Sequence, residues 1–298
     1  KKITKAEVNK AKYKILVIRN DKIGDFMLAW PAFAMLKASI NCEITALVPS
    51  YTRELAELCP YVDKVLVDPG KSADKQAHDS LIEQIKATKF DASICYFTNS
   101  YNARLVWKAK IPNRWAPATK ISQFFYNHRL TQRRSRSLKP EFKYNLDLSE
   151  AFIESLGVDA VEVYPPYFQL DIKKFKEAQS VQLNIDPSNQ WIMVHAGSGG
   201  SANNLSASQD AELIDDLSKK LNNAIFLLTV GPGEERLADK VKGLVSASVV
   251  LAQGYSLHDF CKLLACGDLF IAGSTGPLHI AGALDIPTLG FFPMRRSA

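Results

Sequence analysis

Short apolar stretches of strand-like composition alternate with helical stretches along most of the chain, and this alternation constrains the fold more than any other feature. Tyr13–Arg19 is a run rich in aliphatic residues, and apolar residues recur at helical spacing in Asp25–Ala38, which follows it. Parallel strands need long crossovers, so strands that alternate with helices predict βαβ units and a parallel sheet. In this half the expected strands are 13–19, 43–48, 65–67 and 92–97, and the expected helices are 25–38, 52–58, 74–88 and 144–156.

Two stretches interrupt the alternation. Residues 112–142 are rich in Pro, Asn, aromatic residues and Arg, and they predict an ordered but irregular insertion. Residues 160–187 contain Tyr164-Pro-Pro-Tyr167, which cannot continue a helix, and they predict the connection between two domains. The alternation then restarts, with expected strands 191–195, 224–230, 248–251, 269–272 and 288–292 and expected helices 208–221, 234–244, 256–266 (with Ser256 as its N-cap) and 276–284.

The length of 298 residues favours two domains. We expect a Rossmann-like domain over residues 1–165 and a second one over residues 166–298. Such domains bind ligands at the carboxyl ends of their strands, so we expect an α/β protein with two parallel sheets and a ligand cleft between the halves.

The composition excludes a disordered chain, because 47% of the residues are hydrophobic and 23% are charged. The five cysteines form no Cys-x-x-Cys pair and no zinc-like cluster with histidine, so we expect reduced thiols in a cytoplasmic protein. The net charge of +6 is compatible with a partner that carries phosphates or with an anionic membrane surface, but it does not require either.

Four junctions between a strand and a helix contain residues that are candidates for catalysis or ligand binding. The first is Arg19-Asn-Asp-Lys-Ile-Gly-Asp25, where Gly24 permits a tight turn and the close approach of another molecule, and Asp25 stands at the start of a helix. Asp25 either complements the helix dipole or acts as a general base at the mouth of the cleft.

The second junction, His195–Asn204, holds Gly197, Ser198, Gly199, Gly200 and Ser201. Their backbone N–H groups and hydroxyls could bind a phosphate, although the spacing matches neither a dinucleotide fingerprint nor a P-loop. The alternative is an ordinary flexible loop.

The other two junctions lie further along the second half. Gly231-Pro-Gly233 delivers Glu234 and Glu235 to a helix start, where they either accept hydrogen bonds from a ribose or complement the helix dipole. Ser274, Thr275 and Gly276 lead into a helix with Pro277 near its first turn, and such an N-terminus binds anions. His279, one turn later, is a candidate for phosphate contact.

These junctions together resemble family 9 glycosyltransferases, the lipopolysaccharide heptosyltransferase family. The run Lys14–Arg19 with Gly24-Asp25 and Pro31 looks like the family's opening, and Gly231–Arg236 is similar to its Gly-Gly-Pro-x-Glu turn. The segment from Ser274 to His279 is similar to its Asp-Thr-Gly-x-x-His motif. The matches follow the family's order and cover both halves of the chain.

The resemblance implies a GT-B fold and an inverting transfer of a heptose, or a related sugar, from an ADP-sugar to a lipopolysaccharide inner-core acceptor. It implies that Asp25 is the general base. It implies that 197–201, Ser274, Thr275, Gly276 and His279 hold the donor diphosphate, and that Glu234 or Glu235 contacts the ribose. On the acceptor side, the expected residues are Arg19, Lys22, Gly24, Arg133, Arg134 and Arg136.

The chain departs from the family pattern at three places. Ser274 stands where the family usually has an acidic residue, and Asn203-Asn204 stands where it usually has a cation. The C-terminal domain is expected to be shorter than in other members. No Asp-x-Asp occurs, so we expect no metal and no cofactor, with the diphosphate stabilised by helix ends and cations.

The basic stretch Arg129–Lys139 is either a solvated loop or a site that captures an anionic, lipid-linked glycan acceptor. We therefore expect a cytoplasmic protein with peripheral contact to the inner membrane, and no nucleic-acid partner. Two other functions remain open at this point: a sugar-nucleotide epimerase, and a two-domain sugar-binding protein without enzymatic activity. A catalytically silent relative of the family is also compatible with Ser274 and Asn203.

Overall fold

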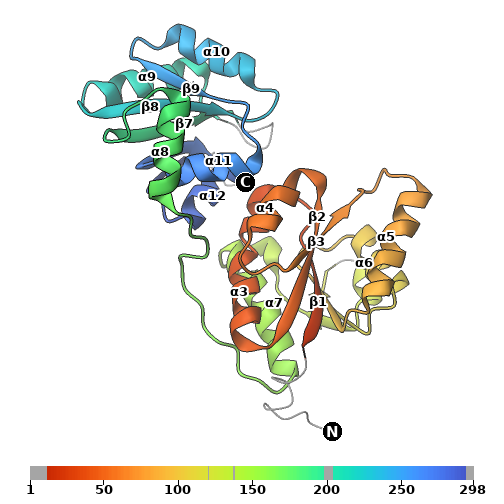
Figure 1. Ribbon diagram of the computed structural model, residues 1–298. Coiled ribbons are helices and arrows are strands. Elements are labelled where there is room, and N and C mark those ends of the chain that lie inside the picture. Colours follow the sequence, from red (N-terminus) through yellow and green to blue (C-terminus); the bar gives the residue numbers. More distant parts are fainter. Residues whose placement is uncertain (1–11, 120, 137, 198–203, 293–298) are drawn as a thin grey trace. The chain divides into compact units, whose positions relative to one another are not determined.

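The computed structural model describes residues 12–119, 121–136, 138–197 and 204–292. The chain divides into two compact units, Lys1–Tyr167 and Phe168–Ala298. Each unit is built on one parallel sheet that lies between two layers of helices (Figure 1).

The first unit has a six-stranded sheet in the order β3-β2-β1-β4-β5-β6, and every strand pairing in it is parallel. Helices α3 and α7 pack together on one face, and α5 and α6 lie on the other (Figure 1). The strands are β1 (Tyr13–Ile18), β2 (Cys42–Pro49), β3 (Lys64–Asp68), β4 (Ala92–Cys95), β5 (Asn113–Pro117) and β6 (His128–Leu130). The helices are α2 (Ile23–Met27), α3 (Trp30–Ser39), α4 (Arg53–Leu58), α5 (Lys75–Thr88), α6 (Ser100–Lys108) and α7 (Glu141–Ser155), with short 3-10 turns η1 (Ser50–Thr52), η2 (Ile121–Phe125) and η3 (Arg134–Arg136).

The expected helix over residues 25–38 is in fact two helices, α2 and α3, separated at Leu28 and Ala29. Pro31 lies in the first turn of α3. Proline has no N–H to donate, and its ring clashes with the carbonyl four residues earlier, so an uninterrupted helix cannot pass through this position.

The prediction of an irregular insertion over residues 112–142 was wrong. Strands β5 and β6 lie there and extend the sheet beyond β4. Both are short and contain Asn, Arg or Pro, so their sequences lack the apolar run that marks a buried strand. Their place in the sheet depends on tertiary packing, because Trp115 of β5 stacks on His128 and makes an edge contact with Phe152 of α7.

The second unit has a five-stranded parallel sheet in the order β11-β10-β7-β8-β9. Its strands are β7 (Gln190–Ala196), β8 (Ala224–Val230), β9 (Val249–Ala252), β10 (Leu269–Gly273) and β11 (Thr288–Phe291). The helices are α8 (Ile172–Leu183), α9 (Ala207–Ser218), α10 (Glu235–Leu244), α11 (Leu257–Ala265) and α12 (Gly276–Ala283). The expected N-cap is confirmed, since the Ser256 side chain accepts a hydrogen bond from Asp259 N. Helix α8 occupies part of the stretch expected to be a connection, and Asp171 caps it.

The strand order reverses once in each sheet, between β1 and β4 in the first unit and between β7 and β10 in the second. At such a switch point the crossovers on the two sides run to opposite faces, which leaves a crevice at the carboxyl ends of the two strands. The α/β fold class with two parallel sheets is therefore confirmed, and the topology designates one candidate ligand site in each unit.

All five cysteines are buried and free of disulfides. Within the described residues, no helix combines the length and the apolar character that crossing a bilayer would need.

Candidate functional site

The switch point of the first unit is organised by Arg19, which directly follows β1. The Arg19 side chain is only 4% exposed, and its guanidinium contacts three carboxylates. Arg19 Nε lies 3.0 Å from Asp21 Oδ1, Nη2 lies 3.0 Å from Asp25 Oδ1, and Nη1 lies 3.3 Å from Glu141 Oε1. Nη1 also donates to the carbonyl of Tyr96, just beyond β4. Arg19 thus links the ends of the two strands that flank the switch point.

A second arginine extends this network. Arg134 Nη1 lies 2.6 Å from Glu141 Oε1 and donates to the same Tyr96 carbonyl at 3.2 Å. Arg134 Nε donates to Gln132 Oε1, and the guanidinium lies over the Tyr144 ring. Burial lowers the pKa of Arg134 from its ordinary value. The expected acceptor cations Arg19 and Arg134 are therefore both engaged in ion pairs inside the unit.

Asp25 lies in the first turn of α2, and its side chain is 32% exposed. Arg19 holds Oδ1, whereas Oδ2 has no hydrogen bond or ion pair within the described part of the chain. The neighbouring Asp21 is more enclosed, and burial raises its pKa to about 6, against the opposing effect of Arg19. Nearby Asp25 raises it further, because two adjacent carboxylates disfavour double ionisation. Asp25 is thus a fixed, partly exposed carboxylate with one oxygen available.

The remaining expected acceptor residues lie around this network. Gly24 is buried within α2 and does not have a positive φ, so the expected tight turn at Gly24 is not formed. Lys22 precedes α2 and is exposed. Arg133, which has a φ of 48°, and Arg136 are exposed on either side of Arg134. These three cations are accessible, in contrast to Arg19 and Arg134.

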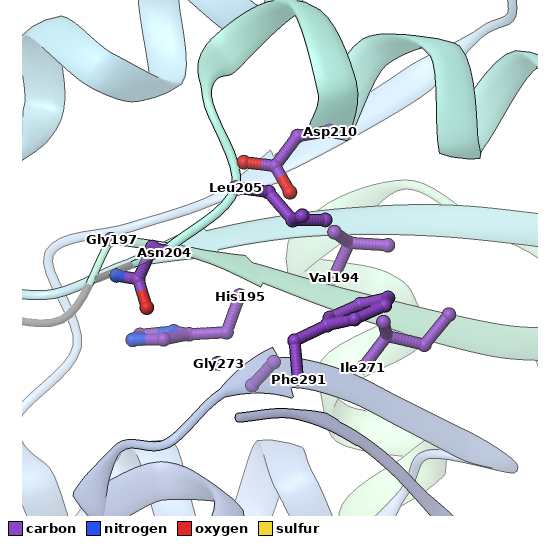
Figure 2. Close-up of a pocket in the computed structure, with 10 residues that line it drawn as sticks. Val194, His195, Gly197, Asn204, Leu205, Asp210, Ile271, Gly273 and Phe291 are labelled. Atoms are coloured by element: carbon purple, nitrogen blue, oxygen red, sulfur yellow. The ribbon is translucent and has the colours of Figure 1, made fainter. Parts of the chain in front are cut away.

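The switch point of the second unit contains a small cavity of about 10 Å³, enough for about one water molecule. Figure 2 shows His195 and Asn204 on one side of it and Phe291 and Ile271 on the other. Asn204 occupies this place because residue 273 is glycine: a Cβ at Gly273 would collide with Asn204 Oδ1. Asn204 Oδ1 is buried and has no hydrogen-bond partner within the described part of the chain. The other lining residues are Val194, Gly197, Leu205, Asp210 and Ala272.

Two of the lining side chains are titratable, and burial shifts both. His195 Nδ1 lies 2.9 Å from Thr229 Oγ1, and burial lowers the pKa of His195 to about 4. Its imidazole is therefore neutral at pH 7. Burial raises the pKa of Asp210, in the first turn of α9, to about 6. Among the described residues that line this cavity there is no lysine or arginine.

Glu234 reaches from the turn after β8 toward the end of β7. Its Oε2 accepts a hydrogen bond from Gly231 N at 3.2 Å, and a Cβ on Gly197 would lie 2.5 Å from both carboxylate oxygens. Gly197 has a φ of +87°, which glycine adopts without strain. Glu235 behaves differently, because it is exposed and accepts from Gly233 N. Hydrogen bonds from its own backbone N–H and from that of Gly233 lower the pKa of Glu235. Of the two glutamates, Glu234 is the one at the switch point.

The segment Ser274–His279 begins where β10 ends, as expected. Thr275 is the N-cap of α12, but its side chain makes no capping hydrogen bond, and its buried Oγ1 has no partner among the residues that the structure describes. Ser274, Gly276 and His279 are partly exposed. A buried hydroxyl that lacks a partner at a helix N-terminus is well suited to an anionic ligand. Ser198, Gly199, Gly200 and Ser201, the rest of the expected phosphate loop, lie outside the described residues, and so does Asn203.

Sequence reasoning missed Glu141, Asp21 and Thr229, which complete these two networks. Glu141 could have been noticed as the first acidic residue after Asp91. Among the residues that the structure describes, no group of three or more His, Cys, Asp and Glu side chains is arranged to hold a metal ion.

Comparisons with known proteins agree with this fold. The family model of glycosyltransferase family 9 (heptosyltransferase) matches residues 79–296. A Haemophilus influenzae protein named "Putative glycosyltransferase" is 50% identical over 292 residues, which covers 96% of this chain and 84% of that protein. Lipopolysaccharide heptosyltransferase 1 of Campylobacter coli is 24% identical over 305 residues, covering 94% of this chain and 83% of that protein.

Among solved structures, the Escherichia coli ADP-heptose lipopolysaccharide heptosyltransferase II matches with a TM-score of 0.78 at 17% identity. The match covers 93% of this chain and 84% of that one. The similarity shows that the chain shares the GT-B fold of these enzymes. The chain belongs to glycosyltransferase family 9, the heptosyltransferase family, and is a glycosyltransferase.

Proposed function

We propose that this glycosyltransferase moves a heptose, or a related sugar, from an ADP-sugar to the inner core of a lipopolysaccharide acceptor, with inversion at the anomeric carbon. The names of the similar proteins support this choice, since one is a lipopolysaccharide heptosyltransferase and another is an ADP-heptose enzyme. Membership of the family favours a transferase over the epimerase and the sugar-binding protein.

Asp25 is the proposed general base. Its Oδ2 takes the proton from the acceptor hydroxyl as the hydroxyl oxygen bonds to the anomeric carbon. The bond from that carbon to the diphosphate oxygen breaks, and its electron pair leaves with ADP. The observation that carries this role is the carboxylate itself, held through Oδ1 by a buried arginine and unpartnered at Oδ2 within the described residues.

Arg19 acts in this scheme as a positioning residue rather than as the acceptor ligand expected from the sequence. A guanidinium is a rigid fork of donors, so contact with Asp21, Asp25 and Glu141 at once restricts the rotation of the Asp25 carboxylate. Contacts with the acceptor then come from Lys22, Arg133 and Arg136, which are exposed. Arg134 contributes by holding Glu141.

The donor diphosphate is proposed to bind at the switch point of the second unit. Thr275 Oγ1 and the first N–H groups of α12 donate to the phosphate oxygens, with His279 one turn further along. The 197–201 loop adds further backbone donors, and Glu234 accepts from the ribose hydroxyls. This site stabilises the departing diphosphate without a metal or cofactor in our proposal, so the dipoles of helix N-termini and cationic side chains of the protein carry the charge.

The assay that tests the proposal supplies ADP-heptose and a deacylated inner-core acceptor and follows the masses of both substrates. The expected product is an acceptor heavier by one heptose, with equal release of ADP, and the rate is expected to be unchanged by EDTA. A donor that changes in the absence of acceptor would instead identify an epimerase. An EDTA-sensitive rate restored by a divalent cation would contradict the metal-independent scheme. We further propose a cytoplasmic location with peripheral contact at the inner membrane, where such an acceptor is embedded.

A further inference from the structure

One segment of the first unit has an unusual charge distribution. Residues 92–140 contain ten lysines and arginines and no aspartate or glutamate. The whole chain has a net charge of only +6, so the rest of it is net acidic. A segment of this kind attracts an anionic partner to one part of the molecule.

The same segment exposes large apolar side chains. Ile121 is 84% exposed, Phe124 is 73% exposed, and Trp107 of α6 is 52% exposed. Ile121 and Phe124 are three residues apart in the 3-10 turn η2, where side chains at this spacing lie on the same side. Ser122, in the same turn, is buried instead. The turn therefore presents an apolar edge outward.

Specific contacts hold η2 in this position. Arg114 Nε donates to the carbonyl of Phe125 at 2.8 Å, and its Nη1 donates to that of Ile111 at 2.6 Å. The Phe125 ring packs against the core and makes an edge contact with Trp107, with 5.6 Å between ring centroids. The outward apolar residues therefore stand on a supported turn that packs against α6.

Cations lie beside two of these apolar residues, Phe124 and Trp107. Arg129 places its guanidinium 5.7 Å from the centre of the Phe124 ring. Arg104 and Lys108 lie three residues before and one residue after Trp107 on α6, and they are four residues apart, so they share a helix face. All three cations are exposed, and none forms an ion pair with any residue that the structure describes. We call Arg104, Trp107, Lys108, Ile121, Phe124 and Arg129 the α6–η2 face (α6 is labelled in Figure 1).

We infer that the α6–η2 face docks on a bilayer that contains anionic phospholipids. The cations approach the lipid phosphates, and the side chains of Ile121 and Phe124 enter the boundary between headgroups and acyl chains, as apolar residues do in interfacial segments. A nucleic acid fits less well, because Arg129 covers one face of the Phe124 ring and an aliphatic Ile121 offers no surface for base stacking. The inference adds a membrane-docking surface to the proposed function. It rests on that function for the identity of the membrane, because the proposed lipid-linked acceptor is embedded in the inner membrane.

The test is co-sedimentation of the full chain with large unilamellar vesicles, without donor or acceptor. We expect binding to vesicles of phosphatidylglycerol and phosphatidylethanolamine, weak binding to pure phosphatidylcholine, and loss of binding as NaCl rises from about 0.05 to about 0.5 M. Ile121→Ser with Phe124→Ser is expected to weaken binding about tenfold or more, and so is the triple change of Arg104, Lys108 and Arg129 to Gln.

Matched controls change exposed residues of the same kind in the second unit or elsewhere in the first. Ile172→Ser with Val181→Ser removes two exposed apolar residues of α8, and Lys71→Gln, Lys240→Gln and Lys242→Gln together remove three exposed cations. Both controls should sediment like the parent chain. Thermal unfolding checks that each variant is folded.

The inference is overturned if the parent does not bind anionic vesicles, or if the face variants bind as the parent does. It is also overturned if a single-stranded oligonucleotide displaces the vesicles from the parent and binds the Ile121→Ser, Phe124→Ser variant with undiminished affinity. Transfer to a deacylated, water-soluble acceptor should be unchanged in that variant. A variant that loses vesicle binding but keeps transfer separates this inference from the proposed function. A parent chain that binds vesicles but shows no transfer activity would count against the proposed function alone.

Discussion

Arg19 Nη2 lies 3.0 Å from Asp25 Oδ1, and the arginine is buried whereas the aspartate is partly exposed. The same guanidinium contacts Asp21 and Glu141. Three carboxylates therefore share one buried cation directly, with Arg134 as a second cation beyond Glu141. This arrangement explains how the first turn of a five-residue helix can hold a carboxylate in a defined orientation.

Replacing Asp25 by Asn should abolish transfer and leave the donor site intact. The amide cannot accept the acceptor proton, so we expect kcat to fall by about 10²- to 10⁴-fold. The Kd for ADP-sugar, measured by calorimetry, should change less than about twofold. Asp79→Asn, on an exposed part of α5, is the matched control and should have parental kcat. Full turnover in the Asp25 variant would remove this residue from the base role.

Changes at Arg19 should separate positioning from stability. Arg19→Lys keeps the charge, but one ammonium cannot span three carboxylates, so kcat should fall about tenfold with donor affinity unchanged. Arg19→Gln removes the buried cation that the largely enclosed Asp21 and the partly exposed Asp25 and Glu141 share, and it should lower the free energy of unfolding in urea by about 1–3 kcal/mol. Arg53→Lys, in an exposed pair with Glu57, should change neither quantity. An unaltered kcat in Arg19→Lys would refute the positioning role.

Gly197→Ala should weaken donor binding more than Gly233→Ala does. The two glycines have similar positive φ values, 87° and 82°, so alanine causes comparable backbone strain of about 1–2 kcal/mol at each. A Cβ at 197 would also collide with the Glu234 carboxylate, whereas nothing lies within 4 Å of a Cβ at 233. If Glu234 contacts the ribose, the Kd for ADP should rise about tenfold in Gly197→Ala alone. Equal ADP affinity in the two variants would argue against that contact.

Asp210 should make the protein less stable as the pH rises. Burial raises its folded-state pKa to about 6, above the ordinary value of 3.8, so between these values the folded chain binds more protons than the unfolded chain. The free energy of unfolding therefore decreases from about pH 4 to about pH 6 through this group, by at most about 3 kcal/mol. Asp210→Asn should remove this loss and be more stable than the parent at about pH 8.

Urea unfolding of both proteins at about pH 4.5 and about pH 8 checks this prediction. Glu212→Gln, exposed on the same helix, is the control. Its free energy of unfolding should differ from that of the parent by the same amount at both pH values. A difference between Asp210→Asn and the parent that does not depend on pH would mean that burial does not shift this carboxyl.

The α/β class and most of the elements could be predicted from the amino-acid sequence, because strand and helix periodicity are local properties of the chain. In the second half the strand Ala224–Val230 and the cap Ser256 lie where they were predicted, and the glycine-rich junctions follow strands as expected. Local rules also account for the break between α2 and α3, since Pro31 interrupts any helix that runs through it.

The side chains that meet at the two switch points could not be predicted in this way, because long-range packing brings them together. Arg19 and Glu141 are 122 residues apart, and they come together because β1 and β4 are neighbours in the sheet and α7 packs on α3. Glu234 meets Gly197 because β7 and β8 pair in register. Strands β5 and β6 likewise depend on packing, since their polar sequences become strands only against β4 and α7. Such contacts follow from strand order and register, which arise from the burial of the whole sheet rather than from any local pattern of residues.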